Sequence, residues 1–278
     1  MKFQKILKKI LALGLLAVLL LTAGCATKGN PDPYEKYNRK VFKFNMGVDK
    51  FVYRPIAVAY DTVTPKVAQH GVSNFFSNID LVPSIANDIL QFNFPWAFAD
   101  TGRLIVNSTL GLGGLLDPAT KFGMHKHTQD FGLTLAKWGV KDSPYFMLPF
   151  LPPATVRDFV GQGLDLSVLS VWAYVRPVWI TYAAFGLDFT NRRASYLSTD
   201  KLLKEAFDPY LFMRDAYLQQ RKGQVQQILN PQSKPEDLQS DVFGESNEDH
   251  FSDANADSSN TDLTHSEKEA KTPAPTKG

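Results

Sequence analysis

The stretch LSVLSVWAYVRPVWITYAAFGL, residues 166–187, has the length of a transmembrane helix, so its interpretation decides the fold. It carries one charge, at Arg176, and Pro177 follows directly at the middle of the stretch. A central arginine costs about 2.5–3.5 kcal/mol on membrane-insertion scales, and a proline inside a helix breaks it. We therefore expect two apolar half-helices here, and not one membrane span.

Prolines punctuate the chain on the N-terminal side of this stretch. Three of them each precede a helix-like segment: Pro65 before residues 66–77, Pro83 before 84–91 and Pro95 before 96–110. Sustained alternation of apolar and polar residues, the pattern of half-buried strands, does not occur. The sequence predicts an all-α fold, built as a single domain of short, proline-broken helices.

The helical domain begins and ends with the same local signal. In DPYE at residues 32–35, the aspartate is suited to the N-cap, the proline to the first helical position and the glutamate to a capping box. Arg54-Pro55 is expected to end that first helix. A second Asp-Pro-Tyr start lies at residues 208–210, and the domain is predicted to cover residues 32–229.

The region between the two ends is less regular. GLGG at residues 111–114 breaks the chain, and Asp117-Pro118 is suited to capping a short turn of helix. Residues 131–138 are predicted to be helical. Residues 145–151 are apolar and expected to be extended around Pro149.

The N-terminus reads as a secretory leader. Four lysines precede an apolar run of 12 residues, 10–21, which is too short for a comfortable membrane span. LTAGC at residues 21–25 resembles a bacterial lipobox, which implies removal of residues 1–24 as a signal peptide and lipidation of Cys25. Residues 25–31 then form a lipidated linker, and Ala26 favours sorting to the inner leaflet of the outer membrane.

Charge and composition separate the C-terminal end from the domain. Residues 230–278 carry 11 acidic residues against 4 lysines and few apolar ones, and we predict an acidic, disordered tail. The net charge of the whole chain is +2, and no strong basic patch indicates nucleic-acid binding. The 20 Phe, 4 Trp and 10 Tyr fit either a large core or contact with lipid headgroups, and both interpretations stay open.

Motifs for catalysis are weak. The glycines at 111, 113 and 114 lack the context of a phosphate-binding loop, and a hinge or tight turn is favoured. His125 and His127 are a poor metal pair and are expected in a solvated loop. A hydrolase would need one of these two or His70, without a GxSxG elbow. We predict no catalytic residue, cofactor or metal, and the chain is not expected to be an enzyme.

Nine segments, in this order, resemble the MlaA/VacJ family of outer-membrane lipoproteins. They are DPYEKYNRKVFKFN (32–45), RPIAVAYDTVTP (54–65), GVSNFFSN (71–78), NDILQ (87–91), RLIVNSTLGLGGLLDPA (103–119), DFGLTLAKWGV (130–140), PYFMLPF (144–150), TVRDFVG (155–161) and DPYLFMRDAYLQQR (208–221). One departure is PPAT at 152–155, where the family usually has a glycine-containing turn.

The resemblance implies a ring-shaped body embedded in the inner leaflet of the outer membrane, with a central amphipathic channel. Its implied partners are phospholipids, a trimeric porin and a periplasmic lipid carrier. Phospholipids mislocalised to the outer leaflet would pass through the channel to the carrier, which would maintain lipid asymmetry. A porin scaffold and, less favoured, a lipid hydrolase are the alternatives.

Polar residues inside the family-like segments are the candidates for the channel lining. They are Asn45, Asp49, Arg103, Asn107, Arg157 and Asp158. Gly111, Gly113 and Gly114 are expected to form a flexible element. Arg103, Arg157 and Asp158 also fit a second interpretation, as buried ion pairs that hold the structure together.

Overall fold

The computed structural model describes residues 30–140 and 143–230, which belong to one compact unit. This part of the chain is mostly helical. The elements are α2 (Glu35–Val48), η1 (Asp49–Tyr53), α3 (Arg54–Val63), α4 (Lys66–Ile79), α5 (Leu81–Leu90), α6 (Phe94–Thr109), α7 (Pro118–Lys121), α8 (Phe131–Lys137), β1 (Tyr145–Phe146), β2 (Ala154–Thr155), α9 (Val156–Leu164), η2 (Asp165–Leu169), η3 (Val171–Ala173), α10 (Val178–Ser195), η4 (Leu197–Thr199), α11 (Asp200–Glu205) and α12 (Pro209–Leu229).

The prediction of an all-α fold needs one correction. Strands β1 and β2 form a short antiparallel pair in which Tyr145 faces Thr155 and Phe146 faces Ala154. The pair is too short to show the alternation by which a strand is recognised in a sequence. The chain is therefore mostly helical, with one small hairpin.

The first helix differs from its prediction at both ends. Its N-cap is Tyr34, and the side chain of Asp32 accepts hydrogen bonds from Asn38 and Tyr210 instead of capping. Arg54-Pro55 does not end the helical path, because the π-helical turn η1 precedes it and α3 starts at Arg54. Pro55 has no N–H to give to the preceding turn, and the path passes this point as a π-helical turn in which the Arg54 N–H bonds to the carbonyl oxygen of Asp49.

Most of the other predicted helix starts are confirmed. Pro65 is the N-cap of α4, and Pro95 lies in the first turn of α6. Pro83 does not precede its helix as predicted, because α5 begins at Leu81 and holds Pro83 in its first turn, where a proline is tolerated. The side chains of Asp117 and Asp208 accept backbone N–H groups at the starts of α7 and α12.

The stretch 166–187 is not one helix. Its second half begins α10, which starts directly after Pro177 and runs on to Ser195. The first half is not the predicted half-helix: it consists of the π-helical turn η2 and the 3₁₀ turn η3. Apolar composition predicted burial or lipid contact here but not the type of turn.

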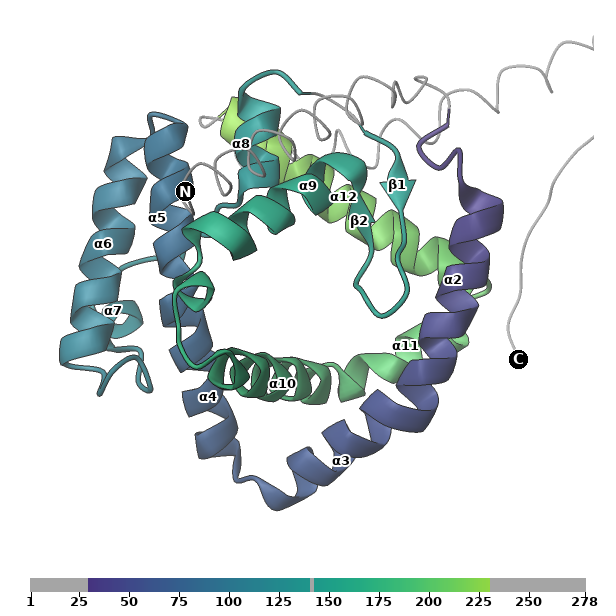
Figure 1. Ribbon diagram of the computed structural model, residues 1–278, viewed down its shortest axis with the longest axis horizontal. Coiled ribbons are helices and arrows are strands. Elements are labelled where there is room, and N and C mark those ends of the chain that lie inside the picture. Colours follow the sequence, from purple (N-terminus) through teal and green to yellow (C-terminus); the bar gives the residue numbers. More distant parts are fainter. Residues whose placement is uncertain (1–29, 141–142, 231–278) are drawn as a thin grey trace, which may run out of the picture. The chain divides into compact units, whose positions relative to one another are not determined.

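Helices α2, α3, α4, α5, α8 and α12 follow one another around a closed circuit (Figure 1). Contacts join α4 to α5, α5 to α8 and α8 to both α9 and α12, while α10 packs against α3 and α4. A small core closes the circuit between α2, β1 and α12. Its buried members are Val41, Phe42, Tyr145, Met147 and Tyr210.

Candidate functional site

Asn45 on α2 fixes the loop between the two strands. Its Nδ2 donates to the carbonyl oxygen of Leu148 at 3.0 Å, and its Oδ1 accepts the N–H of Phe150 at 2.9 Å. The Phe44 and Phe150 rings also meet edge to face at 5.1 Å. This predicted lining residue therefore holds a hairpin loop against α2, and its side chain remains half-buried.

Asp49, at the start of η1, accepts a bidentate pair from Arg193 of α10. The Nε–Oδ1 and Nη2–Oδ2 distances are 2.6 and 2.8 Å. The same Arg193 also donates to Asp200 of α11 at 2.9 Å. One guanidinium thus joins α10 and α11 to η1, which lies 144 residues away in the sequence.

Arg103 and Asn107 lie one turn apart on α6 and both bind Asp117. Arg103 is 3% exposed, and its Nη2 lies 3.0 Å from Oδ2 of Asp117. Asn107 donates to Oδ1 of Asp117 at 3.0 Å and accepts the N–H of Ala119 at 3.0 Å. These bonds fasten the start of α7 to α6.

The glycines at 111, 113 and 114 form the tight turn between α6 and α7. Gly113 and Gly114 have φ angles of +71° and +92°, a region that favours glycine. A Cβ atom at Gly111 would collide with the carbonyl oxygens of Asn107 and Leu116. The turn and its close packing explain the glycines, while the flexibility of this element stays a prediction.

Arg157 and Asp158 open α9 and belong to a buried ionic network. Oδ1 of Asp158 accepts from Arg157 at 3.2 Å and from Arg221 of α12 at 2.8 Å. Its Oδ2 accepts from the Tyr217 hydroxyl at 2.6 Å. Arg221 also binds Asp130 through two bonds of 2.6 and 2.7 Å. The network ties α8, α9 and α12 together.

All six predicted lining residues have protein partners. Arg103, Asn107, Arg157 and Asp158 are buried, so their bonds support the interpretation as structural pairs. Asn45 and Asp49 keep partial exposure. Their contribution to a channel lining stays a prediction.

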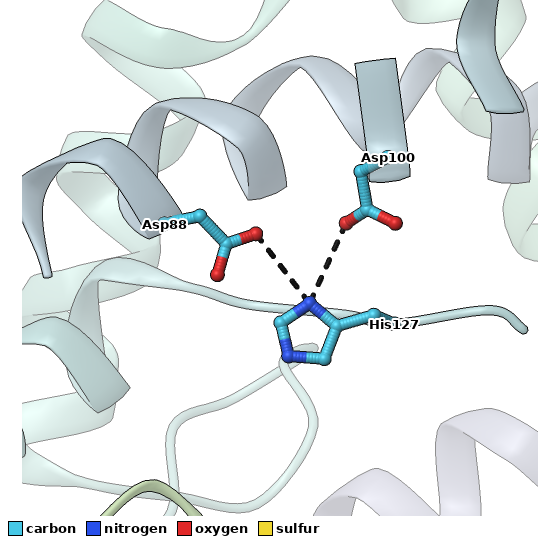
Figure 2. Close-up of side chains that lie close together, drawn as sticks. All are labelled: Asp88, Asp100 and His127. Carbon is cyan, nitrogen blue, oxygen red and sulfur yellow. Dashed lines mark ion pairs between the residues drawn. The ribbon is translucent and has the colours of Figure 1, made fainter. Parts of the chain in front are cut away.

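The prediction of a solvated loop at 125–127 is wrong for His127. His125 is exposed, but the side chain of His127 is 15% exposed and lies between two fully buried carboxylates. Its Nδ1 is 3.4 Å from Oδ2 of Asp88 on α5 and 3.5 Å from Oδ2 of Asp100 on α6. Figure 2 shows both carboxylates converging on that one nitrogen.

The surroundings of His127 fix its ring. Trp96 stacks on it with a centroid distance of 4.3 Å, and the Gln129 amide nitrogen lies 3.1 Å from its Nε2. Burial alone would lower the pKa of His127, but the carboxylates of Asp100 and Asp88 outweigh it and raise that pKa to about 9. Sequence reasoning missed this cluster because its members come from α5, α6 and the segment before α8.

A polar cleft of about 240 Å³ borders His127. It lies between α4, the start of α5, residues 126–128 and α10. The lining residues are Ser73, Ser77, Asp80, Leu81, Lys126, His127, Thr128, Asp188 and Arg192. Cationic, anionic and hydroxyl groups therefore share one concave surface.

Many of the large apolar side chains are exposed. Val63 and Val67, at the turn between α3 and α4, are 81% and 82% exposed, and Phe98 on α6 is 77% exposed. Such surfaces mark contact with a membrane or a protein partner. Within the described ranges, no helix combines the length and the apolar character needed to cross a bilayer.

The fold and these residues can be compared with known proteins. The model of the MlaA lipoprotein family matches residues 30–224, which is more than half of the chain. The chain belongs to the MlaA lipoprotein family. All nine segments that carried the resemblance in the sequence fall inside this match.

Relatives of this MlaA-family chain include proteins from three bacteria. An uncharacterized protein of Rickettsia prowazekii (strain Madrid E) is 35% identical over 201 residues, covering 70% of this chain and 78% of the relative. The intermembrane phospholipid transport system lipoprotein MlaA of Escherichia coli K12 is 32% identical over 234 residues, covering 77% and 90%. The protein of that name from Haemophilus influenzae is 29% identical over 248 residues, covering 84% and 98%.

A solved structure resembles this MlaA-family fold. It comes from work on the structural basis for maintenance of bacterial outer-membrane lipid asymmetry. The TM-score is 0.61 at 33% identity, and the match covers 68% of this chain and 96% of the solved one. Cys25, the leader and residues 231–278 lie outside the described residues, so lipidation and the acidic tail stay predictions.

Proposed function

We propose that this protein is an outer-membrane lipoprotein that removes mislocalised phospholipids from the outer leaflet and passes them to a periplasmic lipid carrier. The match of the MlaA family model to residues 30–224 carries the proposal. The relatives from Escherichia coli and Haemophilus influenzae are named as lipoproteins of intermembrane phospholipid transport. The protein thereby maintains the lipid asymmetry of the outer membrane.

Family membership also places the chain among transport lipoproteins and not among enzymes. The hydrolase alternative needed a histidine that lies between a carboxylate and a nucleophile. Of its three candidates, His70 and His125 are exposed, and His127 has carboxylates at Nδ1 but the Gln129 amide, not a nucleophile, beside Nε2. A role in transport is favoured over hydrolysis.

The proposed route for lipid lies inside the circuit of helices. Moving a charged headgroup through hydrocarbon costs many kcal/mol, so a passage with polar groups lowers the barrier. The half-exposed Asn45 and Asp49 are the lining candidates that we retain, and the polar cleft beside His127 adds further polar surface. The buried residues would stabilise the helices around this passage. They are Arg103, Asn107, Arg157 and Asp158.

The outward apolar residues suit a body that sits in one leaflet. An acylated Cys25 would tether it there, because each buried CH₂ of an acyl chain contributes about 0.8 kcal/mol and several chains anchor a protein stably. A trimeric porin is the proposed protein partner in the membrane. In the scaffold alternative, the main role of the protein is its contact with the porin, and it does not transport lipid.

Cells that lack this protein provide the test. Surface-exposed phospholipid is measured in the deletion strain and in strains complemented with the wild-type chain or with Cys25→Ser. We expect the amount to rise on deletion, to return to normal with the wild-type chain and to stay high with Cys25→Ser. No rise on deletion, together with altered porin assembly, would support the scaffold alternative instead.

A further inference from the structure

We propose that Asp88, Asp100 and His127 form a binding site for one divalent transition-metal ion, best suited to Zn²⁺. The three residues come from α5, α6 and the segment between α7 and α8 (Figure 2). Each offers one ligand atom, and these atoms all lie within 4.8 Å of one another. The site goes beyond the proposed function, which involves no metal.

The distances fit a metal better than a shared proton. His127 Nδ1 is 3.4 Å from one carboxylate oxygen and 3.5 Å from the other. An N–H···O hydrogen bond is normally 2.7–3.2 Å long, and one N–H cannot point at two separate acceptors well. A tetrahedral ion with bonds of about 2.0–2.1 Å holds its ligands ~3.3 Å apart, which is close to the two separations from Nδ1.

Two facing atoms of the cluster point to a ligand. Oδ2 of Asp88 and Nδ1 of His127 lie 3.4 Å apart, and both are buried without a hydrogen-bond partner among the described residues. On Asp100 the oxygen that faces His127 is Oδ2, which accepts the Ser84 hydroxyl at 3.4 Å, while Oδ1 is the buried oxygen without a partner. Both aspartate side chains are fully buried. A buried carboxylate oxygen without a partner is costly, and coordination of Oδ2 of Asp88 to a metal would remove that cost.

The charge balance favours a dication. The charged groups that act on Asp88 are His127 and Asp100, with no lysine or arginine among them. Two carboxylates and a neutral imidazole carry a charge of −2, which Zn²⁺ would neutralise. A protonated His127 would balance only one of two charged carboxylates.

The neighbours of His127 are also those of a metal ligand. Trp96 holds the ring plane, and the Gln129 amide lies 3.1 Å from Nε2. The Gln129 oxygen accepts from the Gln91 amide at 3.1 Å. If both amides exchange their oxygen and nitrogen positions, Gln129 accepts the Nε2 proton and leaves the Nδ1 lone pair for the ion. Imidazole nitrogen and carboxylate oxygen are both ordinary zinc ligands.

Zinc titration of the purified full-length protein in detergent tests the site, after removal of bound metal with EDTA. Calorimetry and metal analysis after dialysis are run on wild type, Asp88→Asn, Asp100→Asn and the control His125→Gln. We expect one Zn²⁺ per chain, at least tenfold weaker binding in both Asn variants and unchanged binding in His125→Gln. Failure of the wild-type chain to bind stoichiometric Zn²⁺, or equal loss in the His125→Gln control, would overturn the proposal.

A second measurement needs no variant and so does not depend on their folding. Co²⁺ is added to the wild-type protein, and its visible absorption is recorded before and after competition with Zn²⁺. An intense spectrum of four-coordinate Co²⁺ that Zn²⁺ abolishes supports the site. The weak spectrum of hydrated, six-coordinate Co²⁺ contradicts it and leaves the cluster as a proton-bridged ion pair.

Discussion

Asp32 and Asp208 both stand before Pro-Tyr, yet only Asp208 caps a helix. The Asp208 side chain accepts the N–H groups of Tyr210 and Leu211, as the local pattern predicts. Asp32 is instead buried and accepts the hydroxyl of Tyr210, a residue of the second motif. A tertiary contact thus overrides a local preference worth about 1 kcal/mol.

At the scale of single residues, Asp158→Asn should strongly destabilise the fold. The buried carboxylate receives bonds from Arg157, Arg221 and Tyr217, and removal of its charge leaves two guanidinium groups without their buried partner. We expect a loss of about 3–5 kcal/mol in the free energy of unfolding. Chemical unfolding followed by circular dichroism measures it. The exposed pair Lys201–Glu205 supplies the control, since Glu205→Gln should change stability by less than about 0.5 kcal/mol.

The same variant should show a characteristic pH dependence. Burial would raise the pKa of Asp158, but the Arg221 and Arg157 guanidinium groups outweigh burial and hold that pKa below its usual value. Its stabilisation is therefore present above the unfolded pKa of about 3.9 and is lost as pH falls through the lower folded value. The difference in the free energy of unfolding between Asp158→Asn and wild type should be largest at pH 7 and should shrink below about pH 4. A difference that stays constant into acid would argue against this charge-based account.

Asp165 should behave in the opposite way. Burial raises its pKa to about 6, although the N–H of Phe131 and the amide of Asn87 oppose the shift. A raised pKa means that its contribution is present below about pH 4 and is lost as pH rises through about 6. Relative to Asp165→Asn, the wild-type chain should lose about 2–3 kcal/mol of stability between pH 4 and pH 7. Parallel stability curves for the two proteins would refute the assignment.

At the scale of elements, the sequence predicted helices whose start signals are local. Asp117 and Asp208 cap α7 and α12 with their own side chains, and Pro65 precedes α4 as expected. The prediction that Arg54-Pro55 ends the first helix was wrong. A π-helical turn, which has no clear sequence signal, connects α2 to α3 at this point. Helix starts were therefore predicted better than turns inside helical paths.

The turn between α6 and α7 gives a matched pair of glycine substitutions. Gly113→Ala meets nothing within 4 Å and should cost only about 1–2 kcal/mol for its positive φ. At Gly114 the new Cβ would also lie 2.8 Å from Nδ2 of Asn78, which adds about 1–3 kcal/mol of overpacking. In thermal unfolding, the melting temperature of Gly114→Ala should be well below that of Gly113→Ala. Equal melting temperatures would mean that the turn relaxes freely, as the prediction of a flexible element implies.

The candidate sites differ in how far the sequence could locate them. Arg103, Arg157 and Asp158 were predicted as buried ion partners because charges inside apolar segments need compensation. The Asp88–Asp100–His127 cluster was missed. Its residues are separated along the chain and meet only where α5 and α6 pack together beside the segment before α8.

At the scale of the whole molecule, polar groups are buried and apolar groups exposed to an unusual degree. Among the described residues, buried polar and charged side chains outnumber buried hydrophobic ones. Buried ionic networks hold the helices to one another, while large apolar side chains such as Val63, Val67 and Phe98 are exposed. This inversion fits a protein whose surroundings include lipid.

The outward apolar residues should bind membranes even without the lipid anchor. A chain of residues 26–278, which lacks both the acylated cysteine and the apolar leader, is expected to sediment with phospholipid vesicles, and adding Val63→Ser, Val67→Ser and Phe98→Ser should release most of it. The reason is the loss of apolar area, worth about 25 cal/mol per Å². Gln219→Ser with Gln220→Ser, at exposed polar positions of α12, is the control and should leave binding unchanged. Unchanged binding of the triple variant would assign these residues to a protein partner.

The central claim is that phospholipid passes inside the circuit of helices. Photoreactive residues placed at Asp49, at the outward Val63 and at the exposed polar Lys201 test it most directly in living cells, with phospholipid adducts identified by mass spectrometry. We predict adducts at Asp49 and Val63 and none at Lys201. Adducts at Val63 alone, with a correctly folded Asp49 variant that stays unlabelled, would contradict an internal route.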